Sequence, residues 1–127
     1  MQERQLYEYA VIRVMPRVER EEFLNVGVVL YCASKKFLQA TYILDNNRVK
    51  AFCKSCDAHQ VEAYLKAFQN ICKGNGDAGP ISLLPAAARF RWLTATRSTV
   101  VQTSRVHPGL CIEPAEMLEK LFNDLVV

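Results

Sequence analysis

The chain has 127 residues, half of them hydrophobic and 23% charged, with only five glycines and five prolines. This composition describes a compact globular domain and excludes disordered, collagen-like and long repeat proteins. A chain of this length buries roughly two-thirds of the surface that its unfolded form exposes, so the core needs no metal or disulfide to fold. We therefore expect a single domain over residues 1–127 that needs no cofactor.

The sequence shows no sign of export or membrane insertion. Its longest apolar run, residues 26–32, has the length of a strand and contains Gly27, whereas a membrane span needs about 20 apolar residues. The first five residues are polar and lack the apolar segment of a secretory signal. Five cysteines, an odd number, fit reduced thiols better than a disulfide framework. We expect a cytoplasmic location.

Three extended stretches open the chain. Residues 6–15 alternate with apolar side chains on both faces, which predicts a strand buried on both sides. Residues 23–32 predict the next strand, and residues 37–44 follow after a hairpin-sized loop, so we expect an antiparallel meander. In the second strand one unbroken apolar face is expected from Leu24, Val26, Val28, Leu30 and Cys32.

The middle and the end of the chain have helical spacing. Asp45 predicts the N-cap of a short helix over residues 46–54, and Ser55 or Asp57 predicts that of the next helix, which a glycine-rich loop ends. The buried stripe of this second helix is expected from Val61, Tyr64, Leu65, Phe68, Ile71 and Cys72. Pro114 fits the first turn of a final helix with an apolar face of Met117, Leu118, Leu121, Phe122 and Leu125.

One segment between these helices fits two structures. Residues 86–94 can form a helix opened by Pro85 or an alternating strand, and both alternatives stay open. Residues 98–103 predict one further strand. The order of elements predicts an α+β fold in which helices pack on an antiparallel sheet of about four strands, a meander of three plus one late strand.

The positive charge of the chain is concentrated in one segment. The net charge is only +3, yet no carboxylate occurs between Asp77 and Glu113, a window that contains four arginines. Guanidinium groups bind phosphates and carboxylates through paired hydrogen bonds. We predict a site for an anionic ligand or partner from Arg89, Arg91, Arg97, Ser98, Gln102, His107 and Asn25.

Several of these residues have a second interpretation. The arginines can instead form ion pairs with the acidic final helix or with the glutamates of residues 19–22. Asn25, two residues before Gly27, indicates either a ligand contact or a β-bulge. His107 is followed by the Pro-Gly pair at 108–109, which predicts a turn on which it contacts a ligand or serves as a general base.

Two further sets suit other chemistry but favour ordinary structural roles. Phe90 and Trp92 alternate with arginines and could stack on single-stranded nucleic acid, although burial in the core is the favoured interpretation. Because the spacing of the cysteines and histidines matches no zinc module, we expect ordinary thiols and no metal site. The four residues of zinc-ligand type are Cys53, Cys56, His59 and Cys72.

Two long stretches carry a resemblance to a known family. They are YAVIRVMPRVEREEFLNVGVVL, residues 9–30, and ARFRWLTATRSTVVQTSRVHPGL, residues 88–110. Together they resemble the bacterial domain of unknown function 3037 family, which has no established activity. Similar proteins are often encoded beside a kinase of the HipA type, so the resemblance implies a partner role in a toxin-like or stress-response system.

These observations support three hypotheses about function. The leading one is an interaction or regulatory protein that binds an anionic partner or ligand through the arginine segment. The second is a hydrolase or nuclease in which His107 acts with the arginines, and the third is a nucleic-acid-binding module. A homodimer is compatible with each of them. No P-loop, dinucleotide-binding, zinc-protease or α/β-hydrolase motif occurs in the sequence.

Overall fold

The computed structural model describes residues 3–16, 22–53, 57–74, 79–95 and 99–127. Within these residues, one antiparallel sheet contains β1 (Gln5–Val14), β2 (Leu24–Cys32), β3 (Phe37–Tyr42), β4 (Val101–Thr103) and β5 (His107–Cys111). The α-helices are α1 (Asn46–Phe52), α2 (Ala58–Lys73), α3 (Ala86–Thr94) and α4 (Pro114–Leu125). Two short 3-10 helices are η2 (Ala33–Lys35) and η3 (Pro80–Leu83). The predicted α+β class is confirmed.

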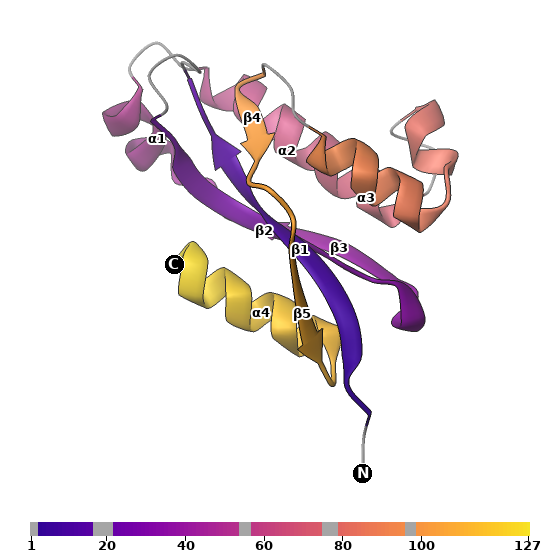
Figure 1. The fold of residues 1–127 in the computed structure, drawn as a ribbon. Helices are drawn as coiled ribbons and strands as arrows, with labels where there is room; N and C mark the ends of the chain where they lie inside the picture. The colour runs from indigo at the N-terminus through magenta and orange to yellow at the C-terminus, as the bar shows by residue number, and fades with distance from the viewer. Residues whose placement is uncertain (1–2, 17–21, 54–56, 75–78, 96–98) are drawn as a thin grey trace.

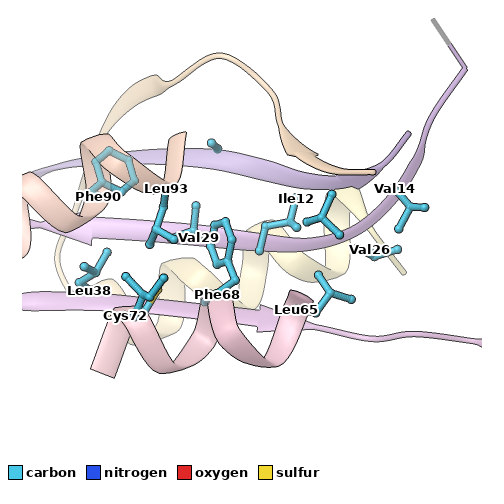
Figure 2. Close-up of a cluster of buried hydrophobic side chains, with 14 of the residues drawn as sticks. Ile12, Val14, Val26, Val29, Leu38, Leu65, Phe68, Cys72, Phe90 and Leu93 are labelled. Atoms are coloured by element: carbon cyan, nitrogen blue, oxygen red, sulfur yellow. The ribbon is translucent and has the colours of Figure 1, made fainter. Parts of the chain in front are cut away.

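Helices cover both faces of the sheet (Figure 1), because β1 and β2 are apolar on both sides. On one face α2 and α3 pack over a first core, drawn in Figure 2, to which Ile12, Leu65 and Phe90 contribute. On the opposite face α4 packs over a second core that includes Leu30 and Leu118. The prediction that the first strand is buried on both faces is therefore confirmed.

A β-bulge in β2 changes which residues share a face. Ile12 of β1 lies opposite Gly27, whereas the next residue, Arg13, lies opposite Asn25, so Val26 is an extra residue in β2. The alternation reverses at this point, and the single apolar face predicted for this strand is wrong. Leu24 and Val26 lie in the first core, whereas Val28, Leu30 and Cys32 lie in the second. The β-bulge interpretation of Asn25 is confirmed.

Gly27 is required where β2 and β3 approach each other beside this bulge. A Cβ atom at position 27 would clash with the carbonyl oxygen of Thr41 and would lie 2.8 Å from the Cβ of Tyr42. These neighbours belong to the backbone and to the start of a side chain, so neither can rotate away. The glycine thus permits the close strand approach that the meander needs.

The last two strands share one edge of β1. β4 pairs with residues 12–14 of β1 and β5 pairs with residues 5–9, so residues 104–106 lie opposite only Ala10 and Val11. Ser104 maintains the hydrogen bonding across this irregularity. Its N–H donates to the carbonyl of Val11 at 2.8 Å, and its Oγ accepts from the N–H of Val11 at 2.9 Å. The two short strands therefore behave as one interrupted edge strand.

The turn predicted at His107 is wrong, because this residue begins β5. Pro108 is compatible with the strand because β5 pairs only with β1 and so lies at an edge, where one row of N–H groups is unpaired. Gly109 is needed because a Cβ there would lie 2.5 Å from the ring of Tyr7 on β1. The sheet therefore has two late strands where one was predicted.

The helices follow the sequence pattern with three exceptions. Asp45 and Asp57 cap α1 and α2 by accepting hydrogen bonds from main-chain N–H groups, as predicted. The undecided segment 86–94 is a helix, α3. The exceptions are Tyr64, 45% exposed and thus outside the buried stripe of α2, Leu125, 36% exposed although predicted on the apolar face of the final helix, and Trp92, 39% exposed although burial was favoured. Among the described residues, no helix is long and apolar enough to cross a membrane.

Candidate functional site

The structure does not bring the predicted anion-binding residues together. Arg89 and Arg91 lie on α3, which packs on the same face of the sheet as α2. His107 pairs with Tyr9 on β1 and contacts its ring, and Asn25 contacts the end of α4, so both lie on the opposite face. Gln102 lies on β4. Two other members of the predicted set, Arg97 and Ser98, fall outside the described residues.

Arg89 is bound to the main chain. Its Nε donates to the carbonyl of Leu84 at 2.8 Å, and one Nη donates to the carbonyls of Ile71 at 2.9 Å and Cys72 at 2.7 Å. Carbonyls at the C-terminus of a helix lack helical partners and carry partial negative charge, so a cation here stabilises α2. The structural alternative therefore applies to Arg89, with carbonyl oxygens as partners in place of the glutamates. Arg91 is exposed on the same helix.

His107 and Asn25 make contacts that stabilise the fold. The half-buried ring of His107 lies 5.3 Å from the ring of Tyr9, measured between centroids. The Nδ2 of Asn25 donates to the carbonyl of Leu125 at 3.2 Å and thereby joins the bulge in β2 to the end of α4. Opposite Asn25, the guanidinium of Arg13 lies 3.9 Å from the ring centroid of Phe23. A part of His107 and Asn25 in ligand binding stays a prediction.

The cysteines and the histidine of zinc-ligand type cannot form one site. His59 and Cys72 lie thirteen residues apart near opposite ends of α2, which separates them by about 20 Å along the helix axis. Burial raises the pKa of the Cys72 thiol to about 12, so the thiolate that zinc requires is disfavoured. Cys56 lies outside the described residues, and no group of three or more potential ligands occurs within the described ranges.

A basic groove lies between β3 and the adjoining ends of α2 and α3. We call it the β3 groove, and it has a volume of about 570 Å³. Of the residues that the structure describes, three cationic side chains line it, Lys36 before β3, Lys73 on α2 and Arg89 on α3, and no carboxylate does. The other lining residues are Phe37, Leu38, Gln39, Ala40, Gln69, Cys72 and Ala86. An excess of positive charge in a concave site favours anions.

A second cavity, of about 180 Å³, lies between α2, α3 and β4. Its described lining residues are mainly apolar and aromatic, among them the partly exposed Tyr64 and Trp92, and none of them is charged. Gln102, the one predicted site residue in its wall, donates its Nε2 to the carbonyl of Thr99 at 2.8 Å. The β3 groove, which three cationic side chains line, is therefore the candidate site for the predicted chemistry.

Comparison with protein families agrees with the resemblance in the sequence. The chain matches, over residues 9–126, the family described as "Protein of unknown function (DUF3037)". The chain belongs to the DUF3037 family. No curated protein and no solved structure matches it significantly. The family assignment predicted from the two long stretches is thus confirmed, and it brings no activity with it.

The sequence of this DUF3037 protein indicated one of the three cations that line the groove, but not the other two. Arg89 was singled out because it lies in the carboxylate-free segment. Lys36 and Lys73 stand among ordinary surface residues, in a hairpin loop and in the last turn of a helix. Only the packing of α2 against β3 brings them to one groove. A cation in a hairpin loop is too common to have marked the site in a single sequence.

Proposed function

We propose that this DUF3037 protein is a small interaction or regulatory protein that binds an anionic partner in the β3 groove. The observation that carries the proposal is that cations from three separate elements line the groove, while no carboxylate is found among its described lining residues. Such an arrangement attracts acidic or phosphorylated groups and rejects cationic ones. The kinase of the HipA type that the family resemblance implies is the first candidate partner.

The three cations have different roles in this proposal. Arg89 is held in place by three main-chain carbonyls and supplies a fixed positive charge at the groove wall. Lys36 and Lys73 are exposed, and their ammonium groups can move to meet a bound anion. Binding is therefore tested at the two lysines, because changing Arg89 would disturb the fold as well.

Charge reversal at these lysines tests the proposal. We expect the Lys36→Glu/Lys73→Glu variant to bind the partner at least about tenfold more weakly than the unchanged protein, because attraction in the groove becomes repulsion. The partner is isolated on the tagged protein from its native cells, and its affinity is then measured by calorimetry. The proposal also requires that binding weaken as salt concentration rises.

The matched control is the Lys50→Glu/Lys66→Glu variant. It makes the same change in net charge at two exposed lysines, on α1 and α2, that do not line the groove. We expect it to retain the partner. Equal weakening by both variants, or by neither, would show that the β3 groove does not bind the partner.

The alternatives receive less support from the geometry. The predicted hydrolase or nuclease uses His107 with the arginines of the carboxylate-free segment, and two of these, Arg89 and Arg91 on α3, lie on the opposite face of the sheet from His107. Stacking of nucleic acid on Trp92 would occur at the apolar cavity, whose described lining residues include no cation to hold a phosphate backbone.

A further inference from the structure

The outer edge of β3 presents main-chain hydrogen-bonding groups to the β3 groove. Just after β3, the N–H of Ile43 donates to the carbonyl of Val26 at 2.8 Å, so the odd-numbered residues here face β2. The even-numbered residues then direct their N–H and C=O groups away from the sheet. The Nε2 of Gln69 confirms this direction, since it donates from α2 to the carbonyl of Ala40 at 3.1 Å.

Few of these outward groups are satisfied. The carbonyl of Ala40 is bonded to Gln69, whereas the N–H of Leu38, the N–H of Ala40 and the carbonyl of Leu38 have no hydrogen-bond partner within the described ranges. The side chains of both residues are buried in the first core, and Figure 2 shows Leu38 beside Cys72 near the end of α2. The groove thus has a helix end on one side and, on the other, a strand edge with two N–H donors that have no partner among the described residues.

We propose that the anionic partner binds here as an extended acidic segment that adds a strand to β3, an inference that rests on the proposed function. Its main chain pairs with Leu38 and Ala40, and its carboxylates lie near Lys36 and Lys73. Adding a strand to a free sheet edge obtains affinity from main-chain hydrogen bonds and specificity from side chains. An acidic segment is favoured over a second copy of this chain, which would bring its own lysines to an already cationic groove.

The probe for this inference is a synthetic peptide of alternating glutamate and threonine residues, compared with the same peptide N-methylated at every second residue. N-methylation preserves the charge and the side chains of the peptide, but it removes the N–H donors along one edge of the peptide strand. We expect the unmethylated peptide to bind and to slow amide exchange at Leu38 and Ala40, measured by nuclear magnetic resonance. The methylated peptide should bind about tenfold more weakly or worse.

The outcomes separate this inference from the proposed function. Equal binding of both peptides, with exchange at Leu38 and Ala40 unchanged, would overturn strand addition and leave an anion-binding groove in place. Failure of the unmethylated peptide to bind would overturn strand addition as well. Binding that is unchanged in Lys36→Glu/Lys73→Glu would overturn the proposed function too, because the charge of the groove would then have no part in recognition.

Discussion

Arg89 shows that an arginine predicted from the sequence to bind a ligand can serve mainly to stabilise the fold. Its side chain joins α3 to carbonyls at the end of α2, seventeen and eighteen residues earlier in the chain. The approach is so close that a Cβ at position 74 would lie 2.7 Å from one Nη of Arg89, so Gly74 ends α2 without obstructing it. Sequence spacing alone cannot distinguish such an arginine from a ligand-binding one.

Removal of this side chain should destabilise the protein. We expect Arg89→Ala to lower the free energy of unfolding by about 1.5–3 kcal/mol, because three carbonyls lose a charged donor. Urea denaturation followed by circular dichroism measures the change. Arg91→Ala is the control, since Arg91 is an exposed arginine on the same helix and its removal should change stability by no more than about 0.5 kcal/mol. Equal losses in the two variants would contradict the capping role.

At the level of elements, periodicity predicted most of the structure. Alternation located β1 and β2, and three-and-four spacing located α2 and α4. The failures occurred where a tertiary contact overrides a local signal. Pro108 and Gly109 are turn residues in isolation, but an edge position and the ring of Tyr7 make them suitable for a strand. Asn25 and Gly27 indicated a β-bulge as one alternative, but the change of face after Val26 depends on the pairing of two strands, so the alternation within one strand did not predict it.

Ser104 makes β4 and β5 act together, and this can be tested. In Ser104→Ala the N–H of Val11 loses its partner in a buried position, so we expect the free energy of unfolding to fall by about 1–3 kcal/mol. The exchange of this amide should also become faster. Ser34→Ala removes the same hydroxyl group from an exposed site and should have little effect. A stable Ser104→Ala protein with a protected Val11 amide would show that the serine does not join the strands.

At the level of the whole molecule, the candidate site depends on packing that no single segment encodes. Lys36, Lys73 and Arg89 belong to three elements, and only the packing of α2 against β3 and of α3 against α2 brings them together. Charge distribution in the sequence therefore singled out Arg89 and led to the prediction of an anionic partner, but it gave no means of finding the two lysines. Conversely, the predicted set was divided because α3, with Arg89 and Arg91, packs on one face of the sheet, whereas His107 of β5 contacts Tyr9 on the other.

The two cores together predict that the protein loses stability in alkaline solution. Burial raises the pKa of Cys72 in the first core to about 12, and in the second core burial raises the pKa of Tyr7 and of Cys111. A thiol in the unfolded chain ionises near pH 8.5, so above about this pH the unfolded state releases protons that the folded state retains. Stability from these groups is complete below this pH and declines as the pH rises further.

For Cys72 alone the decline approaches about 1.4 kcal/mol per pH unit between the unfolded and folded pKa values. Urea midpoints measured from pH 7 to about pH 10.5, under reducing conditions, would show it as a falling curve. Cys72→Ala has a lower stability at pH 7 because it leaves a cavity, but its curve should fall less steeply, since one buried acid is gone. A slope that is the same with and without the thiol would mean that Cys72 ionises in the folded protein as easily as in the unfolded chain.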